Sequence, residues 1–295
     1  MEAANRVVAG TDGSEQSLRA VEWAAHEAAL HGAALRIVSV PALPPRMSWS
    51  RREPGTPGTP DTVADAIHHA SQQALATAAA RASEAEPDLD VDTALLAGSP
   101  AQVLTEAAAG AAMLVVGSRG AGGFAALVLG SVSRYVATQA GSPVVVVREE
   151  TTAVHHEIVV GIRDLDQPAA IRFAFEEAEL RGARLRAVHA WQVFLTQMRL
   201  TGTERPGADA GDVTAEAAGW LAGLLAPWHR KYPGVELVED VVHAAPGRVL
   251  AGASARADLV VLGRNSADDP ARPTTGAVTH AVLHHAHGPV AVIPE

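Results

Sequence analysis

Short apolar runs alternate with longer amphipathic stretches along most of the chain. Residues 6–10, 35–40 and 113–116 are almost continuously apolar, which is typical of strands that are buried on both faces of a parallel sheet. Between such runs, apolar residues recur at helical spacing, as they do in residues 18–30. This alternation predicts an α/β fold in which helices cover both faces of a parallel sheet.

The first half of the chain contains one complete set of these elements. Ser14 is the predicted N-cap of the first helix, with Ser17 as the alternative, and Gly32 ends that helix. Residues 41–60 are rich in proline and glycine and are predicted to form a loop. The predicted strands are residues 6–10, 35–40, 91–96, 113–116 and 144–147, and the predicted helices are residues 18–30, 61–85, 99–109 and 131–140.

The same order of motifs recurs in the second half. Residues 157–161 resemble the first strand, residues 258–263 resemble residues 112–117, and from the third strand onward the offset is 146 residues. A repeat of this length indicates a duplicated domain rather than a solenoid unit. We therefore predict two α/β domains, over residues 1–150 and 155–295.

A glycine loop follows the fourth predicted strand of the first half. Gly117 and Gly120 are separated by two residues, and nine residues then precede Gly130 and Ser131, where a helix is predicted to begin. Glycines allow backbone N–H groups to approach a phosphate, and a helix N-terminus adds partial positive charge. The loop therefore predicts a site for the phosphates of a nucleotide. The alternative is that the glycines only form turns between strand and helix.

Together with Asp12, which follows the first strand, this motif resembles that of the universal stress protein family. The duplication resembles the tandem-domain bacterial members, and the resemblance covers nearly the whole chain, once per half. It implies a doubly wound, five-stranded parallel sheet in strand order 3-2-1-4-5 in each half. It also implies ATP binding where the loop is intact, and a role as a dimerising, stress-linked regulator. We expect the nucleotide to bind as its Mg²⁺ complex.

In this topology the loop that carries Asp12 faces the loop that carries Gly117, because a crevice opens where the winding direction of the chain reverses. Asp12 can accept hydrogen bonds from ribose hydroxyls or from an adenine edge, or it can serve as a helix N-cap. Arg119 could add charge beside the phosphates or lie in solvent. By the resemblance, the backbone near Val40 meets the base. The predicted ATP-binding residues are Ala9, Thr11, Asp12, Val40, Gly117, Ser118, Arg119, Gly120, Gly130, Ser131, Val132 and Ser133.

The matching loop of the second half departs from this motif. Ser266, Ala277 and Arg163 stand where the first half has a glycine, a serine and an aspartate. Serine adopts positive φ less readily than glycine, and Asp268 and Asp269 place carboxylates where phosphates would bind. We predict that this half binds ATP weakly or not at all; the alternative is that main-chain amides make most phosphate contacts and tolerate the serine. The residues of this degenerate site are Gly161, Gly263, Ser266 and Gly276.

Composition narrows the range of functions. The formal net charge of −10 argues against a general affinity for nucleic acid. Lys231 is the only lysine, so the glycine loop lacks the lysine of a Walker phosphate loop. The absence of cysteine excludes disulfides, thiolate catalysis and iron–sulfur clusters. The apolar runs are too short to span a bilayer and residues 1–6 lack a signal segment, so we expect a cytoplasmic protein without a membrane segment.

The sequence predicts no catalytic residue. Ser131 and Ser133 have no evident histidine and acid partners, and no nucleophile-elbow motif is present. His280, His284 and His287 lie at helical spacing and could bind a metal, but the matching first-half helix has no such pattern, so we predict no metal site. The apolar last strand of each half predicts a homodimer or pairing of the two repeats. The leading function is an ATP-binding stress regulator; a nucleotide-free dimerising scaffold and a slow ATP hydrolase are the alternatives.

Overall fold

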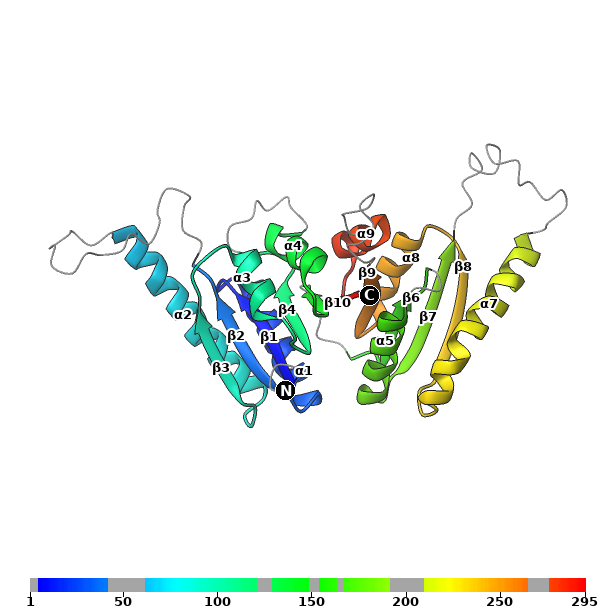
Figure 1. Ribbon diagram of the computed structural model, residues 1–295, viewed down its shortest axis with the longest axis horizontal. Helices are drawn as coiled ribbons and strands as arrows, with labels where there is room; N and C mark the ends of the chain where they lie inside the picture. Colours follow the sequence, from blue (N-terminus) through cyan, green and yellow to red (C-terminus); the bar gives the residue numbers. More distant parts are fainter. Residues whose placement is uncertain are drawn as a thin grey trace. The chain divides into compact units, whose positions relative to one another are not determined.

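The computed structural model describes residues 5–41, 62–120, 129–148, 154–163, 167–191, 210–264 and 276–295. The chain forms two compact units, Met1–Val147 and Arg148–Glu295. Each unit contains five parallel strands with helices packed against the sheet (Figure 1). None of the described helices is long and apolar enough to cross a lipid bilayer.

The first unit has the strand order β3-β2-β1-β4-β5, with every neighbouring pair parallel. This confirms the predicted doubly wound topology. The first helix begins three residues earlier than its apolar periodicity suggests, because Ser14 caps it. The elements are β1 (Arg6–Thr11), α1 (Glu15–Leu30), β2 (Ala34–Ser39), α2 (Thr62–Ala85), β3 (Val91–Leu95), α3 (Pro100–Ala107), β4 (Met113–Gly117), α4 (Ser131–Gln139) and β5 (Val144–Val147).

The second unit repeats this order as β8-β7-β6-β9-β10, again with parallel neighbours. Along the chain, β9, α9 and β10 follow one another in the same order as β4, α4 and β5 of the first unit. The elements are β6 (Glu157–Gly161), α5 (Pro168–Arg181), β7 (Arg184–Trp191), α7 (Ala210–Lys231), β8 (Leu237–His243), α8 (Pro246–Ala253), the 3₁₀ turn η2 (Ser254–Arg256), β9 (Leu259–Arg264), α9 (Ala277–His285) and β10 (Val290–Pro294).

The central strands of each unit are buried because helices cover both faces of the sheet. Every residue of β4 and of β5 is buried, whereas β3 at the sheet edge is partly exposed. In the first unit α1 packs with α2, and α3 packs with α4. Right-handed crossovers place these two pairs on opposite faces of the sheet. The chain therefore leaves β1 and β4, which are neighbours, in opposite directions, and their carboxyl ends are where this topology predicts a crevice.

Candidate functional site

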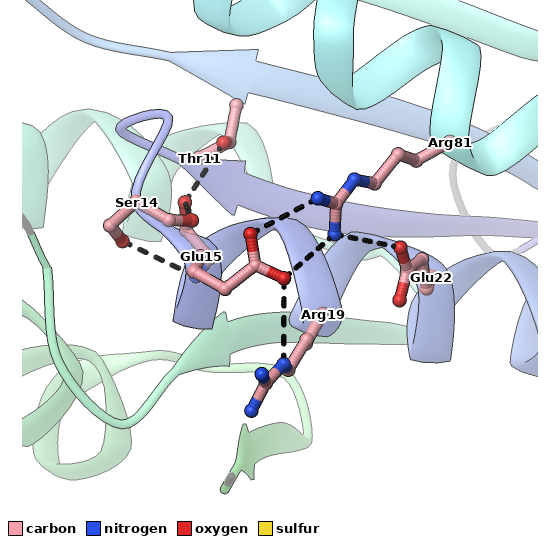
Figure 2. A network of polar contacts seen from close by, with 7 residues as sticks. Thr11, Ser14, Glu15, Arg19, Glu22 and Arg81 are labelled. Carbon is pink, nitrogen blue, oxygen red and sulfur yellow. Dashed lines mark hydrogen bonds and ion pairs between the residues drawn. The ribbon is translucent and has the colours of Figure 1, made fainter. Parts of the chain in front are cut away.

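The turn between β1 and α1 is held by its own hydroxyl groups (Figure 2). The hydroxyls of Thr11 and Ser17 lie 3.1 Å apart, and that of Ser17 donates to the Ser14 carbonyl at 2.9 Å. The Asp12 amide donates to the Ser17 hydroxyl at 3.3 Å, and the Ser14 side chain caps α1 by accepting from the Ser17 amide, also at 3.3 Å. Gly13 completes the turn with a φ of +80°, which is the left-handed region that favours glycine. The turn therefore presents Asp12 in a fixed position.

Asp12 is exposed, and its two carboxylate oxygens have different surroundings. Oδ1 accepts from the Ser14 amide at 3.0 Å, two residues further along the chain. The N-cap of α1 is Ser14, so Asp12 does not have the capping role that the sequence left open. Oδ2 lies against Gly120, and a Cβ added to Gly120 would overlap with it. The structure thus brings together the two loops that the topology predicted to face each other.

Gly117, the last residue of β4, packs directly on the main chain of α1. A Cβ at this position would lie 2.8 Å from the carbonyl oxygen of Gln16 and 2.9 Å from its carbonyl carbon. Real Cβ atoms essentially never approach backbone so closely, and backbone gives way less easily than the end of a side chain. The glycine at position 117 is therefore required for α1 to start close to the end of β4.

Both ends of the glycine loop are tied to the strands beneath it. The Ser118 amide donates to the Val147 carbonyl at 2.9 Å, and the Ser118 carbonyl accepts from the Gly130 amide at 2.8 Å. The buried hydroxyl of Ser133 donates to the Gly117 carbonyl at 2.7 Å. The predicted phosphate contacts of the Ser118 amide, the Gly130 amide and the Ser133 hydroxyl thus compete with internal hydrogen bonds. Their observed role is to hold the two described ends of the loop together.

The first turn of α4 follows directly after Gly130. Gly130 is the N-cap and supplies no side-chain hydrogen bond to the helix. The first-turn amides of Ser131, Val132 and Ser133 have no acceptor within the helix, and the helix dipole adds partial positive charge. Of the three serines among the predicted ATP-binding residues, Ser118 and Ser133 are buried and Ser131 is exposed.

The remaining predicted residues lie at different depths. Ala9 is fully buried in β1, paired with Ile37 and Val115. Val40 directly follows β2 and is half-buried, at the edge where the base is expected. Arg119 is half-buried next to the exposed Gly120.

The corresponding crevice of the second unit contains different groups. Arg163 at the position of Asp12 is exposed, and its amide donates to the Gln167 side-chain oxygen at 2.8 Å. A Cβ at Gly263 would lie 2.6 Å from the Gln167 side-chain nitrogen and 2.9 Å from Glu295 Oε1. Two side chains therefore occupy the place that corresponds to the α1 main chain of the first unit.

Glu295 supplies the N-terminal cap of α5 and was missed by sequence reasoning. Its carboxylate accepts from the amides of Ala169 and Ala170 at 3.0 and 3.1 Å. Gln167, the N-cap residue of α5, makes no side-chain capping bond. The available signal was the lack of a serine, threonine or aspartate at that cap, which indicates that another group satisfies the amides.

Two other glycines of the predicted degenerate site, Gly161 and Gly276, lie at the end of a strand and at the start of a helix. Gly161 is buried at the end of β6, where an added Cβ would lie 2.9 Å from Leu250 and from Leu262. Gly276 is the N-cap of α9 and makes no side-chain capping bond. Ser266, Asp268 and Asp269 lie outside the described residues.

Three histidines, His280, His284 and His287, lie near the end of the second unit. The rings of His280 and His284 lie 4.3 Å apart between centroids on α9. His287 lies beyond the last residue of α9, and its amide donates to the Ser254 hydroxyl at 2.8 Å. Burial lowers the pKa of Arg264, the last residue of β9, but an arginine remains protonated at physiological pH.

Comparisons with known proteins agree with this architecture. The universal stress protein family model matches residues 4–148 and again residues 155–294. Universal stress protein Rv2005c of Mycobacterium tuberculosis is 35% identical over 97% of this chain and 96% of its own length. Universal stress protein Rv2623 of the same species is 30% identical over 98% and 96%. The chain therefore belongs to the universal stress protein family, with two copies of the family's domain.

A solved structure supports the fold over the same length. The universal stress protein from Archaeoglobus fulgidus superimposes with a TM-score of 0.70, covering 99% of this chain and 96% of that protein. Its sequence identity is 18%, so the likeness concerns the fold alone.

Proposed function

We propose that the N-terminal repeat binds ATP as its Mg²⁺ complex and that the chain acts as a stress-response regulator. The observation that carries the proposal is the contact between the Asp12 carboxylate and Gly120. It places a hydrogen-bond acceptor beside a glycine loop that leads to the α4 N-terminus. A nucleoside triphosphate needs both features, an acceptor for its hydroxyls or base and amides for its phosphates.

The groups of the crevice divide into two sets by their chemistry. Asp12 accepts from ribose hydroxyls or from the adenine edge, next to the backbone at Val40. The main chain at Gly120 and the first-turn amides of α4, beginning at Ser131, receive the phosphates. Mg²⁺ usually keeps several water ligands and binds through the phosphates, so it enters as part of the ligand rather than through a dedicated protein cage.

The second repeat is proposed to hold little or no nucleotide. Arg163 replaces the Asp12 carboxylate with a cation, which cannot accept a hydrogen bond from ribose. Glu295 places a carboxylate at the α5 N-terminus, beside Gly263. A negative charge at that end of the crevice repels an approaching phosphate.

Calorimetric titration of the purified chain with MgATP tests the proposal. We expect heat of binding with close to one nucleotide per chain, and ATP in the denatured extract of protein purified without added nucleotide. Two equal sites per chain would contradict the assignment to the N-terminal repeat. Absence of heat, together with an empty extract, would leave the nucleotide-free scaffold as the better hypothesis.

The proposal also covers self-association of the chain, its location in the cell and its rate of ATP hydrolysis. We propose a cytoplasmic protein that self-associates through the last strands of its repeats, as a homodimer or by pairing of the repeats. Sedimentation velocity over a range of concentrations measures this association. Hydrolysis, where it occurs, is expected to be slow, because the proposal includes no general base; phosphate release over hours measures it.

A further inference from the structure

One arginine of α2 contacts two carboxylates of α1 (Figure 2). Nη1 and Nη2 of Arg81 donate to Oε1 and Oε2 of Glu15, each at 3.0 Å. Nη1 also donates to Oε1 of Glu22 at 3.0 Å. Glu15 is the first residue of α1 and Glu22 lies about two turns further along it. A single guanidinium therefore ties two levels of α1 to α2, and we call this group of three residues the Arg81 clamp.

Arg81 and Glu15 each stabilise the ionised form of the other. The hydrogen bond from Arg81 lowers the pKa of the Glu15 carboxyl, and Arg19, 3.6 Å from the same carboxylate, lowers it further. The hydrogen bond with Glu15 raises the pKa of Arg81. Both groups are thus ionised at physiological pH. Bidentate pairing of arginine with a carboxylate also fixes the relative orientation of the two side chains.

The clamp lies next to the turn that carries Asp12. Gly13 packs on α2, where an added Cβ would lie 2.8 Å from the Cβ of Ala74. One residue beyond Glu15, the Gln16 main chain rests on Gly117. The first turn of α1 is thus held between α2 and the end of β4. A displacement of that turn would move Asp12 relative to the glycine loop.

The second repeat lacks two of the three residues of the clamp. At the offset of 146 residues that relates Val91 to Leu237, Arg81 corresponds to Pro227, which has no donor. At the offset of 150 residues that relates Leu30 to Leu180, Glu22 corresponds to Arg172. The clamp is therefore present in the repeat that has the aspartate and the complete glycine motif, and Arg81 and Glu22 are replaced in the other repeat.

We propose that Arg81 is a positioning residue for the nucleotide site, which it serves by clamping the first turn of α1 so that Asp12 stays against Gly120. This rests on the proposed ATP binding in the N-terminal repeat. Because both partners of the main ion pair are partly exposed, the clamp acts on the geometry of the turn more than on the stability of the repeat.

The first test compares MgATP affinities measured by calorimetry. We expect Arg81→Met and Glu15→Gln each to weaken binding by about fivefold, with the double variant no weaker than Arg81→Met alone. Arg36→Met is the matched control, because Arg36 has a similar exposure, 32% against 31%, and pairs with Asp92 on neighbouring strands. Asp12→Asn should cost less in the Arg81→Met background than in the wild type. Additive effects of these two changes would overturn the proposal.

The second test needs no nucleotide. Amide hydrogen exchange of Ser14 and Ser17, whose amides donate within the turn, should be several-fold faster in Arg81→Met and unchanged in Arg36→Met. Unchanged exchange in Arg81→Met would overturn the positioning role, even if the wild type failed to bind ATP. Failure of the wild type to bind MgATP would count against the proposed function, and the exchange result would still decide whether Arg81 holds the turn.

Discussion

The carboxylate of Asp12 lies against Gly120, although the two residues follow different strands of the N-terminal repeat. The contact exists because β1 and β4 are neighbours from which the chain winds in opposite directions. It joins the two loops at which we propose that ATP binds. The contact also provides a specific way to disturb the site without disturbing the fold.

Gly120→Ala should weaken MgATP binding by about tenfold or more, because its Cβ would displace the Asp12 carboxylate. Stability should change by less than about 1 kcal/mol, since Gly120 is exposed and the displaced group is the end of a side chain. Gly141→Ala is the control, because a Cβ at Gly141 meets nothing within 4 Å. Calorimetry and thermal unfolding measure the two effects. Equal affinities of the two variants would contradict the contact's role.

Gly117→Ala should instead destabilise the N-terminal repeat, by about 1–3 kcal/mol. Here the added Cβ meets the Gln16 main chain, so α1 must shift as a whole. Urea unfolding followed by circular dichroism measures the loss, with Gly141→Ala again as the reference. A Gly117→Ala variant as stable as the wild type would show that α1 can move away from β4 at little cost.

Glu295→Gln should destabilise the second repeat by about 1 kcal/mol, because it removes the charge from the carboxylate that accepts from the Ala169 and Ala170 amides. Exchange of these two amides should become faster. Glu239→Gln, at an exposed position of β8, is the matched control. Unchanged exchange in Glu295→Gln would indicate that the capping contact is not populated in solution.

The contribution of Glu15 to stability should disappear in acid. Its folded-state pKa lies below the ordinary value of 4.5, mainly because of the hydrogen bond from Arg81. A depressed carboxyl pKa contributes stability above the unfolded pKa, and this is lost as the pH falls through the folded pKa. The wild type should therefore exceed Glu15→Gln in stability at pH 7 and match it once Glu15 is protonated. Urea unfolding at several pH values measures the difference, and a difference that persists in acid would contradict the assignment.

Local patterns in the sequence predicted the strands and most helices, because each apolar run reflects burial of its own residues. The meeting of Asp12 with Gly120 was also predictable, since it follows from strand order and from the glycine motif. The contacts of Arg81 with Glu15 and of Glu295 with α5 were not. They join residues 66 and 125 positions or more apart, and no motif or periodicity marks the partners. The internal hydrogen bond from the Ser133 hydroxyl to the Gly117 carbonyl was not predictable either, because the sequence does not show which acceptor a loop hydroxyl will find.

The packing of Gly117 on Gln16 has a mechanical consequence. Main chain touches main chain there, so no flexible side chain absorbs a displacement. A displacement of Gly117 would therefore require the first turn of α1 to shift with it. In the second repeat the side chains of Gln167 and Glu295 lie at the same position, and side chains can change rotamer to absorb a displacement. We therefore expect the junction between β4 and α1 to be stiffer than the junction between β9 and α5.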